Sequence, residues 1–130
     1  MAASRERLEV VATEVVDACV AVHRELGAGL LEAVYQACLA KELEERGLKT
    51  RCEVALPVTY KGRELDVGYR VDMIVDDLVL IENKCLQSVH PIHEAQLLTY
   101  LRLSNRRIGF LINWNVLLIR DGIKRMVQNL

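Results

Sequence analysis

The stretch from Leu78 to Lys84 constrains the fold more than any other part of this 130-residue chain. Its four consecutive aliphatic residues are typical of a strand buried on both faces of a sheet. The run ends in an acid, an amide and an ammonium group, Glu82, Asn83 and Lys84. Because unpaired charge is costly to bury, Glu82 and Lys84 need partners or a metal. Asp72 interrupts a second hydrophobic strand nearby, and two such interruptions indicate a functional site.

Whether Asp72 joins this site depends on the turn between the two strands. Side chains alternate across a strand, so Glu82 and Lys84 share one face while Asn83 points to the other. A two-residue loop would turn Asp72 away from Glu82, whereas a three-residue loop at 76–78 would set the two acids opposite each other. We therefore predict an odd-numbered loop, or a bulge that restores the same parity.

If the two acids converge, their repulsion favours a hard divalent cation, Mg²⁺ or Mn²⁺. Asp72, Glu82 and the backbone carbonyl of Asn83 would form half of its coordination shell. Lys84 would orient or deprotonate the attacking water, or stabilise a pentavalent phosphate. The alternative is a buried network of Asp72, Lys84 and Glu82 that holds no metal.

Periodicity along the rest of the chain predicts eight elements in the order ααβββαββ, with a mixed sheet in a single domain spanning residues 1–130. The helices are expected over 5–26, 30–46 and 91–103, and the strands over 54–60, 64–75, 78–84, 108–112 and 116–119. Pro57 predicts an edge strand or a bulge. Asp121 and Gly122 suggest a two-residue hairpin turn. The helix at 91–103 has apolar residues around most of its circumference, so we expect it to be well buried.

Composition narrows the function classes. No apolar run approaches the length of a membrane span, and the first residues carry charges that argue against a secretory signal. The four scattered cysteines favour reduced thiols in a cytoplasmic protein over a disulfide framework or a zinc site.

Charge is distributed unevenly along the chain. The formal net charge is -1, but residues 84–130 hold 7 basic and 2 acidic side chains. This excess could form a positive surface near the charged strand end, although ordinary solvated charges are the favoured reading of the pattern alone. The candidate residues are Arg102, Arg106, Arg107, Arg120, Lys124 and Arg125.

Three polar residues, Glu32, Gln96 and His23, lie on or beside largely apolar helix faces. Glu32 stands at the edge of an apolar arc, where it either reaches inward beside Tyr35 or serves as a first-turn acid favoured by the helix dipole; geometry leaves the two about level. Gln96 lies among apolar residues and needs a hydrogen-bond partner. His23 is better explained as a hydrogen-bonded core or helix-end histidine than as a metal ligand.

Several motifs resemble a known family. Asp72 with Glu82-Asn83-Lys84 is similar to the D…E-x-K signature of the PD-(D/E)xK nuclease superfamily, which is short and weakly specific on its own. The run Gly29 to Tyr35 is similar to the motif that names the GxxExxY proteins, a bacterial branch of that superfamily. The segments 93–101 and 121–125 also resemble this family, so the likeness covers nearly the whole chain.

The resemblance implies a three-layer restriction-endonuclease-like α/β core with metal ligands on the sheet. It implies that Asp72 and Glu82 bind metal and that Lys84 is the catalytic lysine. Glu32 would be an additional acid, and Gln96 a polar residue projected from the next helix. The sequence departs from the pattern in two places. Val71 replaces the usual proline, and polar Asn83 replaces an aliphatic residue, which suggests looser packing on its face of the sheet.

The expected function is Mg²⁺-dependent hydrolysis of phosphodiester bonds in DNA. Substrate contacts are predicted for two tyrosines and three arginines, namely Tyr35, Tyr100, Arg102, Arg106 and Arg107. The alternative is a catalytically silent nuclease-fold binding or assembly module, which could be a subunit of a larger nucleic-acid-processing complex. For partners, the sequence leaves a homodimer and a partner subunit open beside nucleic acid.

Overall fold

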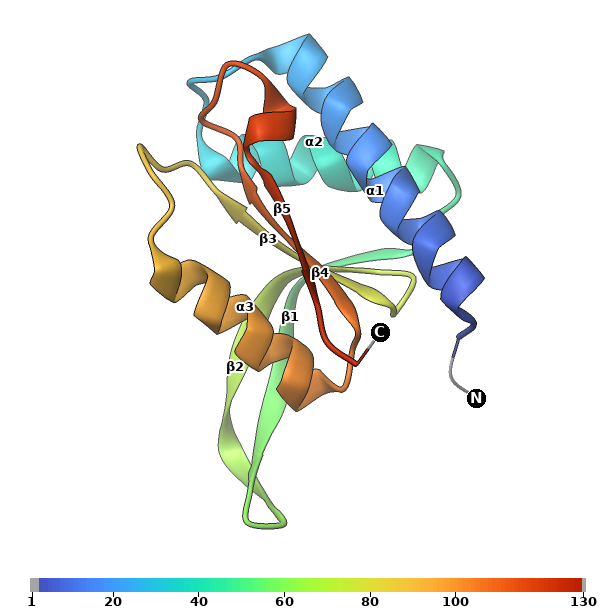
Figure 1. Cartoon of the computed structure of the whole chain (residues 1–130), viewed down its shortest axis with the longest axis vertical. Coiled ribbons are helices and arrows are strands. Elements are labelled where there is room, and N and C mark those ends of the chain that lie inside the picture. Colours follow the sequence, from blue (N-terminus) through green and yellow to red (C-terminus); the bar gives the residue numbers. More distant parts are fainter. Residues whose placement is uncertain (1–2, 130) are drawn as a thin grey trace.

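Five strands form one mixed sheet with β3 at its centre, in the computed structural model, which describes residues 3–129 (Figure 1). The strands are β1 (Thr50–Tyr60), β2 (Arg63–Val75), β3 (Val79–Lys84), β4 (Ile108–Asn113) and β5 (Ile123–Val127). Their spatial order is β1-β2-β3-β4-β5, and only β3 and β4 run parallel. The parallel pair is joined through a helix, as a crossover requires.

Helices cover both faces of the sheet and create two cores. They are α1 (Arg5–Leu26), α2 (Glu32–Glu45) and α3 (Pro91–Ser104). The larger core joins α1 and α2 to one face, and the smaller joins α3 to the other. This confirms the predicted α/β class and element order. None of the helices within residues 3–129 is long and apolar enough to cross a membrane.

The turn between β2 and β3 has the predicted odd parity. Val75 pairs with Val79, so the loop is the three-residue segment 76–78. Asp76 and Asp77 both adopt positive φ angles, 51° and 59°, a conformation that aspartate tolerates better than most residues. The register prediction that brings Asp72 and Glu82 to the same face is therefore confirmed.

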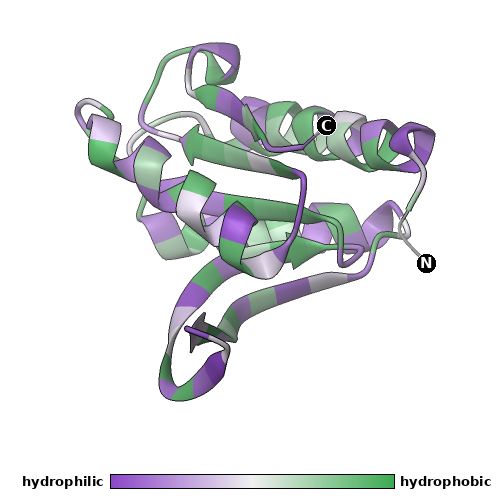
Figure 2. Cartoon of the chain, turned by 60° about the horizontal axis from the view of Figure 1, so that its bottom comes forward, coloured by the Kyte–Doolittle hydropathy of each residue, from purple (hydrophilic) through white to green (hydrophobic). Residues whose placement is uncertain are grey.

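β1 is an edge strand, and a register shift interrupts its ladder with β2 between Pro57 and Thr59. Both features were expected from the proline. The β1–β2 hairpin projects beyond the layers of helices (Figure 1). Figure 2 shows hydrophobic and hydrophilic residues mixed along this projection, and Val67 within it is 67% exposed.

The prediction of a strand at 116–119 is wrong. A loop follows β4 and leads into a short 3₁₀ helix, η1 (Ile119–Asp121), and the last strand is β5. Gly122 makes a close backbone approach: Asn113 N donates to its carbonyl at 2.8 Å, and a Cβ there would overlap the Asn113 carbonyl oxygen. The glycine therefore serves this contact, and Asp121–Gly122 is not a two-residue turn between strands.

The expectation that α3 is well buried is also wrong. Only Leu97 and Leu101 of this helix are buried, while Ile92 is 62% exposed. Among residues 3–129, α3 is the single helix on its face of the sheet, so one side of it remains in solvent. Its ends follow prediction: Pro91 is in the first turn, and Asn105 closes the helix in the left-handed conformation.

Candidate active site

Asp72 and Glu82 bridge a gap where β2 and β3 separate. The backbone ladder between these strands ends at the pair Met73 and Ile81. One residue further, Asp72 N donates to Glu82 Oε1 at 3.1 Å, and Asn83 N donates to Asp72 Oδ2 at 2.8 Å. Each carboxylate thus replaces a missing ladder bond. The two acids are held together by the strands that carry them.

The electrostatics of this pair favour a bound cation. Burial, followed by the nearby charge of Asp72, raises the pKa of Glu82 to about 8. Burial also raises the pKa of Asp72, with a further contribution from Glu53. Lys84 opposes both increases but does not cancel them. Near neutral pH the pair therefore retains a proton unless another positive charge replaces it.

Glu32 and Lys84 complete the charged group. Glu32 is the first residue of α2, and Lys84 is the last residue of β3. Burial and the charge of Asp72 raise the pKa of Glu32, while Lys84 and the backbone N–H of Cys85 lower it. Glu32 is a first-turn acid, as one of the two expectations held, and the charge of Asp72 acts on it although the residue is exposed. Its role in the site stays a prediction.

The prediction of loose packing around Asn83 is wrong. Asn83 is fully buried, and its Oδ1 accepts a 2.9 Å hydrogen bond from Trp114 Nε1. Its Nδ2 donates to Gln36 Oε1 at 3.2 Å and contacts Met73 Sδ at the same distance. A polar residue is accommodated on this face because dedicated partners satisfy its amide.

Tyr35 belongs to this support and not to a substrate surface. Its ring is fully buried and stacks on Trp114, with centroids 4.9 Å apart. Its hydroxyl donates to the Gly27 carbonyl at 2.5 Å and accepts from Leu30 N at 3.2 Å. The predicted role of Tyr35 in substrate contact is therefore corrected to packing of the α1–α2 connection.

The helix α3 provides residues on a further side of the candidate active site. Burial and then the charge of Glu82 raise the pKa of Tyr100, whereas the side chain of Gln96 lowers it. The Tyr100 ring stacks on Tyr69 of β2, with centroids 4.5 Å apart. Gln96 itself is exposed, so the apolar residues around it do not bury its amide. Tyr100 is the α3 residue that the structure brings close to the acids.

One site residue, Glu53, was missed from the sequence. Glu53 of β1 raises the pKa of both Asp72 and Glu32 through its charge, and its Oε1 accepts from Gln36 Nε2 at 2.9 Å. Glu53 has a positive φ of 52° inside a strand. Because no glycine marks this distortion, nothing in the local sequence indicated that Glu53 would reach the site.

The predicted arginine surface is not assembled around the acids. Arg106 Nη2 contacts Asp77 Oδ1 at 2.5 Å, and Arg107 Nη2 lies 3.5 Å from the Ala3 carbonyl. Both arginines precede β4, at the end of the β3–β4 pair opposite Lys84. Arg102 is exposed in the last turn of α3. Lys124 forms an ion pair with Glu94, and Arg125 forms one with Glu9, so both charges are already engaged.

The carboxylates of Asp72 and Glu82 fit a hard cation that takes only a few of its ligands from the protein. Within residues 3–129, no group of three or more His, Cys, Asp or Glu side chains is arranged to hold a metal. Asp72 and Glu82 nevertheless converge and keep raised pKa values. Mg²⁺ commonly takes one or two carboxylates and leaves its other positions to water and substrate phosphate. These residues therefore fit Mg²⁺ or Mn²⁺ as a partial shell, with the Asn83 carbonyl still a predicted ligand.

The fold and the candidate site together define an α/β protein in which a mixed sheet lies between helical layers and carries Asp72, Glu82 and Lys84 on its two neighbouring strands β2 and β3. A family model described as the PD-(D/E)XK nuclease superfamily matches residues 9–126, and the chain belongs to this superfamily. No curated protein and no solved structure matches the chain. The narrower likeness to GxxExxY proteins stays a prediction.

Proposed function

We propose that this protein is a divalent-metal-dependent nuclease that hydrolyses phosphodiester bonds of DNA. The observation that carries the proposal is the Asp72–Glu82 pair, joined through backbone hydrogen bonds where β2 and β3 separate and flanked by Lys84. Superfamily membership supports nuclease chemistry, whereas the metal and the DNA substrate belong to the proposal.

Asp72 and Glu82 would hold the cation, with the Asn83 carbonyl as a third ligand. When bound, Mg²⁺ or Mn²⁺ supplies Lewis acidity toward a phosphate oxygen and lowers the pKa of water. Lys84 would position the attacking water or stabilise the charge that develops on the phosphate. Glu32, which is electrostatically linked to both Asp72 and Lys84, would accept a proton from that water.

Tyr100 and Gln96 would contact the nucleic acid from the α3 side of the acids. The stacked ring of Tyr69 holds Tyr100 in place, and the charge of Glu82 and the side chain of Gln96 both act on the pKa of its hydroxyl. Arg102 remains a candidate phosphate contact because it is exposed. Arg106 and Arg107 are not included, since their side chains are engaged at the other end of the sheet.

The test is nicking of supercoiled plasmid with Mg²⁺ or Mn²⁺, using Asp72→Asn and Lys84→Ala. Each variant should lose roughly 100-fold or more of the activity, the usual scale for removing a catalytic group. Lys61→Ala, which alters an exposed lysine in the hairpin turn, is the matched control. Equal cleavage by wild type and both site variants would identify a contaminant and contradict the proposal.

Metal binding is measured separately by calorimetric titration and thermal shift. Mg²⁺ or Mn²⁺ should bind and stabilise the wild type, and Glu82→Ala and Asp72→Asn should abolish both effects. A parallel assay on a single-stranded RNA and a DNA of the same sequence checks the substrate. If metal binds but no nucleic acid is cut, a silent metal-holding module replaces the enzyme.

A further inference from the structure

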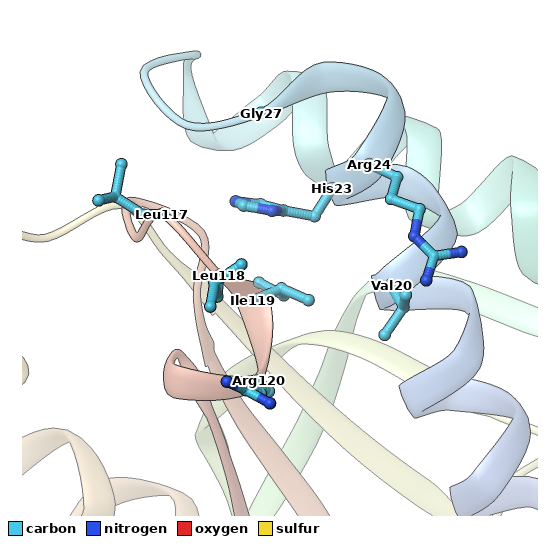
Figure 3. Close-up of a pocket in the computed structure, with 8 residues that line it drawn as sticks. All are labelled: Val20, His23, Arg24, Gly27, Leu117, Leu118, Ile119 and Arg120. Atoms are coloured by element: carbon cyan, nitrogen blue, oxygen red, sulfur yellow. The ribbon is translucent and has the colours of Figure 1, made fainter.

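A pocket of about 540 Å³ lies between the C-terminal end of α1 and the segment that carries η1 (Figure 3). Its lining consists of Val20, His23, Arg24, Gly27, Leu117, Leu118, Ile119 and Arg120. Its volume is in the range that accommodates a small ligand or a few side chains. None of the candidate active-site residues described above lines this pocket, so it is separate from the candidate active site.

Two adjacent leucines at this pocket are unusually exposed. Leu117 is 92% exposed and Leu118 is 53% exposed, whereas the neighbouring Ile119 is buried. Single exposed apolar residues are ordinary, but leucines grouped at the mouth of an apolar pocket mark an interaction surface. An aliphatic side chain entering here would cover Leu117 and Leu118 and contact Val20 and Ile119.

The charge around the pocket is of one sign. Arg24 on α1 and Arg120 on η1 come from opposite walls and are exposed (Figure 3). Neither forms an ion pair among residues 3–129, in contrast to Arg46, Arg106 and Arg125, which do.

No acidic side chain from the described part of the chain lines the pocket. The two acids adjacent in sequence to its arginines, Glu25 and Asp121, line other depressions on the surface. A ligand that places carboxylates at the two walls would therefore provide the missing counter-charges to Arg24 and Arg120.

We propose that this pocket docks a segment of a partner protein in which an aliphatic side chain is flanked by acidic residues. The aliphatic group fills the apolar floor, and the carboxylates pair with Arg24 and Arg120. Apolar anchors in pockets with charged margins are a usual way in which short protein segments are recognised. A nucleic acid fits less well, because its phosphates would lie against the exposed side chains of Leu117 and Leu118.

The docked segment would lie beside the support of the candidate active site. His23, in the pocket wall, places Nε2 3.3 Å from the Trp114 carbonyl. Trp114 in turn donates through its backbone N to the Lys84 carbonyl at 2.9 Å and through Nε1 to Asn83. A partner held here would be brought close to β3 without covering Asp72 or Glu82, which lie on the opposite face of the sheet.

The experiment is selection of random 12-residue displayed peptides on the full chain, with counter-selection on an Arg24→Glu, Arg120→Glu double variant. Enrichment of peptides that combine an aliphatic residue with neighbouring Asp or Glu supports the proposal. Enrichment without acidic residues, or equal enrichment on the double variant, overturns it. An Arg5→Glu, Arg63→Glu variant has the same change in net charge at exposed sites outside the pocket and should select the same peptides as wild type.

An enriched peptide is then titrated by fluorescence anisotropy. Its Kd should rise at least roughly tenfold for the pocket variant and for Leu117→Ser, and should stay unchanged for the Arg5 and Arg63 control. Far-UV circular dichroism verifies that each variant is folded. Concentration-dependent self-association that Leu117→Ser abolishes would assign the surface to a second copy of the chain, and binding of a DNA oligonucleotide lost in the pocket variant would assign it to nucleic acid. Either result overturns the proposal.

Discussion

The Trp114 indole Nε1 donates a 2.9 Å hydrogen bond to Oδ1 of Asn83, the middle residue of the E-x-K run. Both side chains are fully buried. Asn83 lies between Glu82 and Lys84 in β3, but its side chain faces the opposite side of the sheet. The bond to Trp114 therefore holds β3 in place from the side of the sheet that α1 and α2 cover. The Trp114 backbone strengthens the arrangement through its bond to the Lys84 carbonyl.

Trp114→Phe should destabilise the protein, because it keeps an aromatic ring but leaves the Asn83 oxygen buried without that donor. We expect a loss of about 1–3 kcal/mol in the free energy of unfolding, the usual cost of a buried unsatisfied polar group. Urea unfolding should be followed by far-UV circular dichroism, since Trp114 is the only tryptophan. Tyr60→Phe, at a 60% exposed position, is the control and should stay within about 0.5 kcal/mol of wild type.

Stability without metal should fall as pH rises, and Glu82→Gln should remove much of that dependence. The folded state holds the Glu82 proton up to about pH 8, whereas the ordinary value for the unfolded chain is 4.5. The contribution of Glu82 to stability is therefore fully present below pH 4.5 and is lost as pH rises through 8. The pKa of Asp72 is also raised, so its contribution changes with pH in the same direction. One pKa unit corresponds to about 1.4 kcal/mol, so we expect a difference on the order of 3 kcal/mol.

The measurement is urea unfolding of wild type and Glu82→Gln between pH 5 and pH 8 in the presence of a chelator. The free energy of unfolding of the variant should exceed that of wild type at pH 8 and approach it at pH 5. Parallel pH profiles for the two proteins would show that Glu82 is ionised across this range. Added Mg²⁺ should flatten the wild-type profile, because the cation replaces the proton.

Arg106→Ala should lower the free energy of unfolding, whereas Arg102→Ala, in the last turn of α3, should leave it nearly unchanged. Arg106 contacts Asp77 through two hydrogen bonds, one to the carboxylate and one to the backbone carbonyl, and its side chain is 15% exposed. Arg102 is exposed and has no ion pair among residues 3–129. We expect a loss of about 1 kcal/mol for Arg106→Ala and near zero for Arg102→Ala in chemical denaturation. Equal effects would contradict a structural role for Arg106.

Features set by local pattern were predictable from the sequence. The alternation of β3 placed Glu82 and Lys84 on one face. The odd length of the 76–78 loop was inferred from the expectation that Asp72 and Glu82 share a site, and the register of the structure confirms it. Features that depend on remote partners were not. Asn83 is satisfied by Trp114, which is 31 residues away, and Arg106 by Asp77, which is 29 residues away. Aliphatic residues at 116–119 resemble a strand, although they lie in a loop and η1 beside a pocket.

The free edge of β1 determines how this sheet behaves in a crowded solution. A long hairpin with exposed apolar residues would normally invite a neighbouring chain to add a strand and start a fibril. Pro57 offers no N–H to such a strand, and the register shift that follows breaks the spacing of the remaining donors. The proline and the register shift therefore disfavour the addition of a further strand along the outer edge of the projecting hairpin.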